Sequence, residues 1–289
     1  MNSERGCIRP VQKDEVLLAD IQESRRQGRA PRVWWLGQSG FLVLIEGRFL
    51  LLDPYLSDSL TLKYAQTDKP HVRISELVVS PARLSAIDVV TSSHNHTDHL
   101  DPETLRPLVA MNPQIHMVCP EANRTTVRER SGLPEDKIIG LDLSLENQVR
   151  TVAGFEFHAI PAAHETLEKD LHGRPVYLGW VIRRGGWTLY HSGDTILFPG
   201  MVDLLREYSI DLAFLPINGR DPARRVAGNL SGREAAQLAS AAGMRQLIPC
   251  HYDLFAFNTA SPEEFAHTCR LLGQSFQILS LGEGMDLQC

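Results

Sequence analysis

Three histidines and one aspartate lie within six residues of this chain, in the segment Ser93-His94-Asn95-His96-Thr97-Asp98-His99. The segment directly follows an apolar run, so we expect it at the end of a buried strand. Neutral imidazole nitrogens and a carboxylate oxygen are the ligands that zinc and similar divalent cations bind in proteins. A lone H-x-H pair could simply face water, but the complete H-x-H-x-D-H cluster predicts a metal site.

The overall composition is that of a chain able to form a large apolar core. Of its 289 residues, 43% are hydrophobic, and 29 basic residues against 35 acidic ones give a formal charge of -6. A general nucleic-acid binder would normally carry a basic excess, so the charge argues against nucleic acid as the partner. The balance leaves room for a local basic pocket that binds a small anionic substrate.

No segment of the sequence predicts export or membrane insertion. The N-terminus lacks an apolar h-region, and no apolar stretch approaches the ~20 residues that a membrane span needs. The cysteines are odd in number, scattered and without a C-x-x-C pair, which is typical of reduced thiols: Cys7, Cys119, Cys250, Cys269 and Cys289. We therefore expect a soluble cytoplasmic protein.

Strand-like and helix-like segments alternate along the chain and predict an α/β or α+β fold. Strands are expected at 33–36, 41–45, 49–52, 87–92, 115–119, 176–183, 187–191, 212–215, 246–249 and 276–279, with more β-structure at 138–160. Helices are expected at 14–27, 102–111, 121–130, 201–208, 232–242 and 262–272. Because strands precede helices in each half, we expect two similar β/α halves packed sheet to sheet, with helices outside. They would form one domain over residues 1–289, of which 1–13 are poorly ordered.

Local signals predict where several of these elements begin and turn. Asp14 could cap the first helix, and Asp101 followed by proline is a well-formed helix start. Gly154 and the pair at 185–186 are expected to turn hairpins. Residues 54–85 hold few periodic signals and are expected to form a long rim beside the substrate.

The histidine cluster can supply ligands for two metal ions but cannot complete both sites. An extended segment places residues i and i+2 on one face, so His94 and His96 can bind the same ion. Asp98 and His99 follow where the chain turns towards its helix, so they can reach a second ion. The remaining ligands must come from other strand ends, where α/β folds commonly place their sites. Three residues occupy such positions: His164, Asp194 and His251.

This combined set resembles the ligands of the metallo-β-lactamase-fold hydrolases, over a span from the Trp35–Phe41 opening to the segment around His251. The resemblance implies a four-layer αββα sandwich, which agrees with the two β/α halves. It also implies two metal sites joined by a bridging residue. One site would be held by His94, His96 and His164, the other by Asp98, His99 and His251, with Asp194 as the bridge.

Shorter stretches are similar to the L-ascorbate-6-phosphate lactonase group. They are Leu52-Asp53-Pro54, Tyr190-His191-Ser192-Gly193-Asp194-Thr195, Pro216-Ile217-Asn218-Gly219 and His251-Tyr252-Asp253 with Phe255 nearby. The similarity implies a binuclear hydrolase in which a metal-bound hydroxide attacks a lactone or ester carbonyl of a sugar-derived or phosphorylated substrate. Relatives of N-acyl-phosphatidylethanolamine phospholipase D share the ligand set, which leaves a phosphodiesterase as the alternative. A non-catalytic metal-binding protein is the third hypothesis.

The expected cofactors are two divalent metal ions. Nitrogen and oxygen ligands suit zinc, manganese or iron. Affinity alone favours zinc over manganese, whereas the resemblance to the lactonase group implies that manganese is also a candidate. Two ions carry more positive charge than Asp98 and Asp194 neutralise, so the site would attract anions. These two aspartates are the expected catalytic residues, and Asp98 could also carry a proton to the departing alkoxide.

Several residues outside the ligand set are candidates for substrate contact. Arg220 and then Arg224 are the first choices for a phosphate, because arginine forms bidentate contacts with it; a solvated loop explains them equally well. Asn218 belongs to the same loop, and His172 could line the pocket.

Other polar residues are expected to support the ligands or the fold. Gln38 and Asp53 lie at strand ends facing the cluster, where they could hydrogen-bond the metal ligands. His191 is as compatible with simple packing as with such a role. Structural roles are expected for His71, His116, His158 and His267. The helix at 14–27 could contact a second copy in a homo-oligomer.

Overall fold

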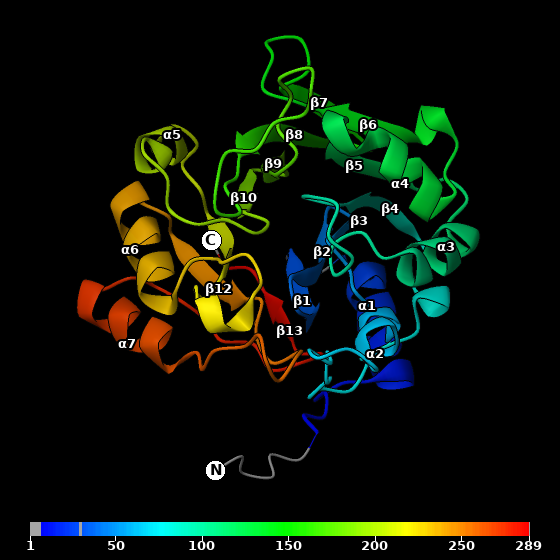
Figure 1. Ribbon diagram of the computed structural model, residues 1–289. Coiled ribbons are helices and arrows are strands. Elements are labelled where there is room, and N and C mark those ends of the chain that lie inside the picture. Colours follow the sequence, from blue (N-terminus) through cyan, green and yellow to red (C-terminus); the bar gives the residue numbers. More distant parts are fainter. Residues whose placement is uncertain (1–6, 29–30, 289) are drawn as a thin grey trace.

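The computed structural model describes residues 7–28 and 31–288, which form two β-sheets between two layers of helices (Figure 1). The first sheet contains β1 (Arg32–Gly37), β2 (Gly40–Ile45), β3 (Arg48–Leu52), β4 (Ile87–Thr91), β5 (His116–Pro120), β6 (Ile138–Leu141) and β13 (Gly284–Asp286). The second contains β7 (Val149–Val152), β8 (Phe155–Pro161), β9 (Leu178–Arg184), β10 (Trp187–His191), β11 (Leu212–Pro216) and β12 (Gln246–Cys250).

The helices lie on the outer sides of the two sheets. They are α1 (Asp14–Arg26), α2 (Ser59–Tyr64), α3 (Pro102–Met111), α4 (Arg124–Ser131), α5 (Met201–Arg206), α6 (Gly232–Ala242) and α7 (Glu263–Leu272). In Figure 1, α1 to α4 lie on one side of the molecule and α5 to α7 on the other. Short 3-10 turns occur at Pro81–Arg83, Glu121–Asn123, Glu135–Lys137 and Pro222–Arg224.

The two sheets repeat one pattern of strand pairing. In the first, β1, β2 and β3 are antiparallel, and β4, β5 and β6 then add in parallel. In the second, β7 to β10 are antiparallel, and β11 and β12 add in parallel. Antiparallel neighbours need only tight turns, whereas parallel neighbours need crossover segments, which here include the helices. The pattern agrees with the two β/α halves expected from the sequence.

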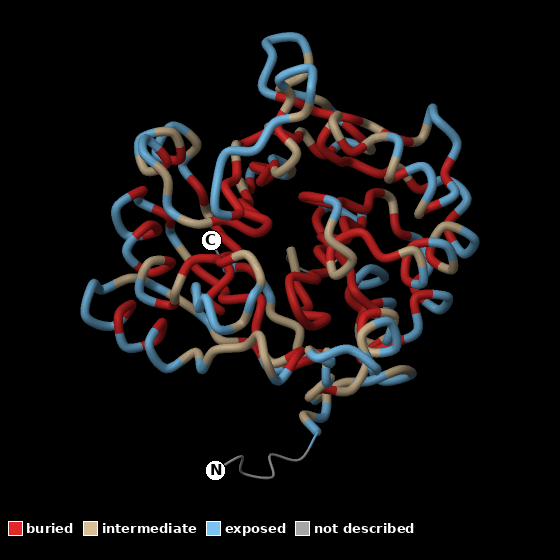
Figure 2. Tube along the Cα trace, in the orientation of Figure 1, coloured by how far each residue is buried: buried red, intermediate tan, exposed pale blue. Residues whose placement is uncertain are grey.

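A single apolar core joins the sheets. Phe41 from β2 contacts Phe214 from β11, with ring centroids 4.3 Å apart. Trp34 and Trp180, one from each sheet, are fully buried. Figure 2 shows buried residues through the two central layers and exposed residues on the outer sides of the helices.

The predicted turns and helix starts are mostly confirmed. Gly185 and Gly186 both have positive φ between β9 and β10, as a two-residue hairpin turn requires. Asp101 caps α3 by accepting hydrogen bonds from the backbone N–H groups of Glu103 and Thr104. Asp14, however, is the first helical residue rather than the cap, which is Lys13.

The last predicted strand is wrong in position. Residues 276–279 contain only an isolated bridge from Phe276 to Leu247, and the final strand is β13. β13 pairs with β1 and so returns to the first sheet. Its short sequence, Gly284-Met285-Asp286, carries no periodic signal that could have predicted it.

The chain's first thirteen residues divide into two parts. Residues 1–6, where we expect poor order, lie outside the described residues. Beyond them, the N–H of Ile8 donates to Ile74 O and that of Val11 to Leu281 O, both at 2.8 Å. Among the described residues, no helix combines the length and apolarity needed to cross a membrane.

Replacing Asp101 should destabilise the fold. Its buried carboxylate also accepts hydrogen bonds from the hydroxyls of Ser57, Ser59 and Thr104 at 2.6, 2.9 and 2.6 Å. Asp101→Ala should have a free energy of unfolding about 2 kcal/mol or more below that of the unaltered protein, because it loses a helix cap and leaves buried donors unpaired. Asp101→Asn, which keeps one acceptor oxygen, should lose less. Urea unfolding followed by circular dichroism measures both, with the exposed Asp136→Ala as control; equal midpoints for Asp101→Ala and the control would contradict this role.

Candidate metal centre

The predicted ligands come from four strand ends that meet along one edge of the sandwich. The histidine cluster follows β4, His164 follows β8, Asp194 follows β10 and His251 follows β12. One strand of the first sheet and three strands of the second therefore deliver side chains to the same place. The structure thus brings together all seven residues of the predicted ligand set.

The first group of ligands is His94, His96 and His164, whose nearest nitrogen atoms lie within 4.8 Å of one another. The Nδ1 of His164 donates a hydrogen bond to Gly228 O at 2.9 Å, which leaves its Nε2 free to bind an ion. The Nε2 of His94 is buried and has no hydrogen-bond partner among the described residues. A buried imidazole nitrogen without a partner costs free energy unless an ion or water occupies it.

The second group is Asp98, His99 and His251, again with one atom of each within 4.8 Å. Gln38 donates from its side-chain amide to Asp98 Oδ2 at 2.8 Å, and the same nitrogen lies 3.1 Å from His251 Nε2. Gln38 therefore has the supporting position that we expected from its strand end.

Asp194 lies between the two groups. Its Oδ1 is 3.2 Å from His99 Nε2, and its Oδ2 is 3.2 Å from His251 Nε2 and 3.5 Å from His164 Nε2. The carboxylate thus reaches ligands of both groups. This is the place that a bridging residue must occupy.

Asp53 orients the ligands but is poorly suited to be one. It forms a third compact group with His94 and His99, yet its oxygens already accept hydrogen bonds from four donor groups. These come from His99 Nδ1 at 2.8 Å, Thr91 Oγ1 at 2.7 Å, and the backbone N–H and hydroxyl of Ser93. Because a carboxylate accepts the Nδ1 proton of His99, the Nε2 of that ring is left for a metal.

Ser93 extends this support to the neighbouring histidine. Its hydroxyl donates to Asp53 and lies 3.0 Å from His94 Nδ1, so its oxygen can accept the proton on that nitrogen. The approach of Ser93 to the Asp194 loop requires a residue without a side chain, because a Cβ at Gly193 would lie 2.5 Å from Ser93 Cβ. Gly193 also has a φ of +59°, which favours glycine.

Three residues at this edge have a strained backbone. Gln38, Asp53 and His251 have φ values of 50°, 36° and 61°, in the left-handed region that residues with a Cβ rarely adopt. Such conformations persist only where surrounding contacts hold them, and they cluster at functional sites. Each of these residues directly follows a strand or joins two strands, where the chain must turn sharply to aim its side chain.

Opposite pKa shifts divide the histidines. Burial, together with the neighbouring imidazoles, holds the pKa of His94 well below its ordinary value. Burial also acts to lower the pKa of His251, but the carboxylates of Asp194 and Asp98 outweigh it and raise that pKa to about 9. Against the same effect of burial, these carboxylates raise the pKa of His99 as well. Without a metal ion, His94 is therefore neutral near pH 7, while His251 holds a proton.

The residues present fit divalent metal ions. The donor set is imidazole nitrogen and carboxylate oxygen, which suits zinc, manganese and iron. Several buried atoms that can bind a metal form no hydrogen bond among the described residues: His94 Nε2, and His99 Nε2 and Asp194 Oδ1, which lie 3.2 Å from each other. The buried carboxylates and imidazoles would be costly to enclose for structural reasons alone.

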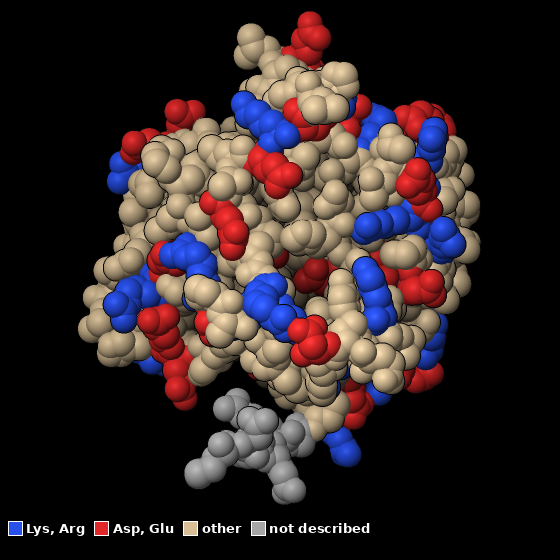
Figure 3. Space-filling view, in the orientation of Figure 1, with Lys and Arg blue, Asp and Glu red and all other residues tan. Residues whose placement is uncertain are grey.

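A cavity of about 520 Å³ opens over these groups. It is lined by metal-centre residues, by two cations and by a set of mostly aromatic side chains: His96, Asp98, His164, Asp194, His251, Lys63, Arg130, Leu60, Tyr64, His71, Phe255 and Phe257. Figure 3 shows acidic atoms recessed near the middle of the viewed face, with basic side chains on the surrounding surface. The volume is that of a small-molecule site.

The residues expected to bind phosphate are not brought to this cavity. Arg220 pairs with Glu234 of α6, and Arg224 donates to the backbone oxygens of Asn218 and Thr259. Neither arginine lines the cavity, and the Asn218 amide is bonded to Asn258 at 2.9 Å instead. Both arginines therefore bind acceptors in or next to their own loop, and they stabilise the loop rather than contact the cavity.

Two other histidines also differ from their expected places. His172 is exposed and does not line the cavity, since its backbone N–H is held by Asp170 in a surface turn. His71, for which a structural role was expected, lines the cavity. No motif marks His71, because two of the rings that it meets, Phe255 and Phe257, are far away in the sequence.

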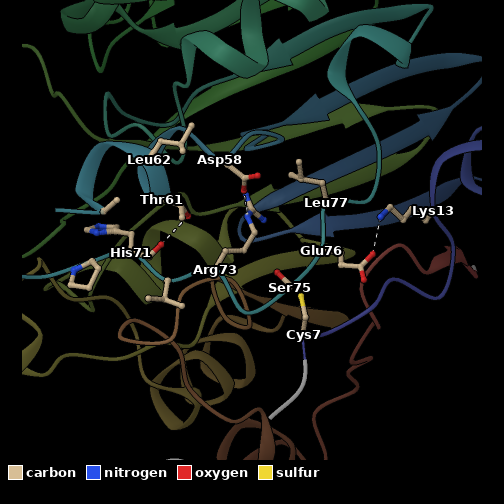
Figure 4. Close-up of a pocket in the computed structure, with 13 residues that line it drawn as sticks. Cys7, Lys13, Asp58, Thr61, Leu62, His71, Arg73, Ser75, Glu76 and Leu77 are labelled. Atoms are coloured by element: carbon tan, nitrogen blue, oxygen red, sulfur yellow. Dashed lines mark hydrogen bonds and ion pairs between the residues drawn. The ribbon is translucent and has the colours of Figure 1, made fainter. Parts of the chain in front are cut away.

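A larger hollow of about 700 Å³ lies apart from the ligands, between α2 and the N-terminal segment (Figure 4). It is lined by Cys7, Lys13, Glu76 and side chains of residues 58–77. None of the compact groups of metal-binding side chains found among the described residues includes one of its residues. We therefore place the chemistry in the smaller cavity.

Comparison with known proteins identifies the family. The model of the beta-lactamase superfamily domain matches residues 48–252. The chain belongs to the beta-lactamase superfamily. A UPF0173 metal-dependent hydrolase from Caldivirga maquilingensis is 29% identical over 250 residues, which cover 86% of this chain and 94% of the relative.

Solved structures show the same fold. Igni18, a metallo hydrolase from Ignicoccus hospitalis, has a TM-score of 0.63 and 22% identity, with 89% of this chain and 98% of that chain covered. The metallo-beta-lactamase fold protein YhfI from Bacillus subtilis has a TM-score of 0.62 and 17% identity, with coverage of 89% and 99%. The predicted metallo-β-lactamase sandwich is confirmed.

Metal binding should release protons and become tighter as the pH rises. An ion needs neutral imidazole, so the proton that His251 holds below its folded pKa of about 9 must leave when the ion binds. Zinc affinity should therefore increase between about pH 6 and pH 9. Calorimetry in two buffers of different ionisation enthalpy measures the protons released. His158→Gln, which alters a ring paired with Glu156 outside the cluster, should behave as the unaltered protein; a pH-independent affinity would contradict the prediction.

Asp53→Asn should weaken metal binding without removing an ion. Losing the carboxylate that orients a ligand commonly costs ~10–100-fold in metal affinity. Competition with a chelator measures the affinity, and elemental analysis of the loaded protein measures the number of ions. Asp88→Asn is the matched control, since Asp88 bonds Arg48 and the backbone of Phe49 at the other end of β4. Complete loss of one ion would show that Asp53 is itself a ligand.

Proposed function

We propose that the protein is a metal-dependent hydrolase with a binuclear centre that cleaves a lactone or another ester. The observation that carries the proposal is the position of Asp194, which contacts ligands of both three-residue groups at the floor of a cavity of substrate size. Structural metal sites usually close with four protein ligands, whereas seven ligands shared by two ions leave positions open for water and substrate. The similarity to metal-dependent hydrolases over most of the chain supports this choice.

The chain's own residues would divide the work. Bound ions would lower the pKa of water and polarise the carbonyl oxygen of the substrate. His94, His96 and His164 would hold one ion, Asp98, His99 and His251 the other, and Asp194 would link them. Asp98 reaches the cavity with 18% of its side chain exposed, so it can also carry a proton to the departing alkoxide.

The substrate that fits this site is a small anion. The two ions would outweigh the charge of Asp98 and Asp194, and Lys63 and Arg130 add positive charge at the cavity wall. Neither cation forms an ion pair within the described part of the chain. Arg130 donates from Nη1 to the backbone oxygens of Asn95 and Leu100, which leaves its charge unneutralised beside the cavity. A phosphorylated or sugar-derived lactone is therefore the class that we favour.

The free thiols described for Cys7, Cys119, Cys250 and Cys269 support a reducing, cytoplasmic location.

Asp194→Ala tests the binuclear centre. Removing the shared carboxylate should lose one ion and lower kcat/KM by more than about a hundredfold, beyond what loss of a merely supporting residue causes. Metal content and activity are measured on the same sample. Asp203→Ala, which alters an exposed carboxylate on α5, should change neither. If Asp194→Ala keeps both ions and full activity, the ligand assignment is wrong.

A substrate panel tests the bond that is cleaved. The metal-loaded protein is assayed against simple lactones, sugar-phosphate lactones and bis-aryl phosphodiesters, with the Asp194→Ala variant as the blank. We expect turnover of lactones, and faster turnover of phosphorylated ones. Cleavage of phosphodiesters alone would contradict the lactonase proposal and indicate a phosphodiesterase of the same fold.

A further inference from the structure

Four aromatic rings form a continuous surface in the cavity beside the metal centre. We call Tyr64, His71, Phe255 and Phe257 the aromatic wall; all four line the same cavity as the ligands. His71 is at its centre: its ring is stacked on Tyr64 with centroids 4.1 Å apart and meets Phe257 edge-on at 4.5 Å. Phe255 and Phe257 lie 6.2 Å apart with nearly parallel rings. These spacings are those of packed aromatic groups.

Two segments that pair with each other beside the cavity hold most of the wall. Arg73 and Phe255 form an antiparallel bridge, the N–H of Ile74 donates to Leu254 O, and that of Ala256 donates to Val72 O, both at 2.9 Å. The second segment begins three residues after the ligand His251. The wall is therefore tied through a short stretch of backbone to the metal centre.

The first segment is held from its other side by α2 (Figure 4). The hydroxyl of Thr61 donates to His71 O at 2.8 Å, and Arg73 is bonded to Asp58 at 2.6 Å. His71 Nδ1 lies 3.1 Å from Lys69 O and must donate its proton there, since a carbonyl only accepts. Burial lowers the pKa of His71, so its ring is neutral near pH 7 and can present an apolar face. These contacts fix the ring before any ligand arrives.

Packing accounts for only part of this arrangement. Tyr64 and Phe257 pack against a small buried core made of Tyr55, Leu60, Leu254 and the wall's own Phe255. Tyr64, His71 and Phe257 nevertheless remain only partly buried and line the cavity, although His71 also lines the larger hollow beside α2. Partly exposed aromatic rings that converge with polar groups are typical of a ligand pocket.

We propose that the aromatic wall binds a planar, apolar group of the substrate, such as an aryl ring, while the scissile ester lies at the ligand cluster. This inference rests on the proposed function and narrows it, because it selects anionic lactones or esters that also carry such a group in the part that does not react. Lys63, whose ammonium lies 5.1 Å from the Tyr64 ring centroid, marks the end of the wall where a negative charge on that group is tolerated. The wall is thus a specificity-determining surface, and its residues take no part in bond cleavage.

Binding of two product-like carboxylates tests the wall without turnover. The zinc-loaded protein is titrated by calorimetry with 3-phenylpropanoate and with propanoate, which share a carboxylate and differ in the aryl ring. The ring should confer tighter binding, and Phe257→Ala and Tyr64→Ala should each weaken 3-phenylpropanoate by about tenfold, the effect of losing about half a ring's contact area. Propanoate should change less than about twofold.

Three controls separate a loss of contact from a loss of structure. Tyr208→Ala removes a partly buried ring on another part of the surface and should alter neither affinity. Phe257→Leu keeps apolar volume and should restore part of the binding, and thermal unfolding checks each variant. In kinetics with aryl and alkyl esters, wall variants should raise KM for the aryl ester and leave kcat unchanged.

The outcomes distinguish this inference from the function on which it rests. Equal affinity of the unaltered protein for the two carboxylates, or equal weakening of both by Phe257→Ala, would contradict the proposed role of the aromatic wall. If the protein still hydrolyses lactones in that case, the proposed hydrolase function is unaffected. Wall-dependent binding of 3-phenylpropanoate without turnover of any lactone or ester would support the wall and overturn the proposed function.

Discussion

The central constraint on this molecule is the burial of carboxylates among imidazoles at the edge where two sheets meet. Asp53, His99 and Asp194 are almost completely shielded from water, and charged groups in such a place are costly unless they are paired. Each is paired here: Asp53 holds one nitrogen of His99, and Asp194 lies 3.2 Å from the other. The arrangement holds the candidate ligands in place and leaves some of their nitrogen and oxygen atoms without a hydrogen bond. A bound metal ion would coordinate these atoms.

The sheets supply the rigidity that this pairing needs. Parallel strands β4, β11 and β12 and the antiparallel strands β8 and β10 all end near one edge, so residues just beyond them converge. Sharp turns with positive φ at Gln38, Asp53 and His251 direct the side chains inward. Strand ends anchored in a shared core cannot shift independently, and this makes the ligand geometry reproducible.

Loops and segments distant in sequence shape the rest of the site. The pairing of residues 72–74 with 254–256 places His71 beside Phe255 and Phe257, and it gives one side of the cavity an apolar surface. The loop with Arg220 and Arg224 instead binds its own neighbours. The candidate metal centre and the aromatic wall therefore have different origins: strand ends build the first, and contacts between loops build the second.

The sequence by itself determined the alternation of strands and helices, most turns and the set of candidate metal-ligating residues. It could do so because strand periodicity, glycine turns and the spacing His94-x-His96-x-Asp98-His99 are local features, and ligands must follow buried strands. Only the tertiary structure decided that β13 returns to the first sheet, that Arg220 faces Glu234, and that His71 enters the cavity. Those outcomes depend on which surfaces meet after the chain has folded, and no local pattern in the sequence carries that information.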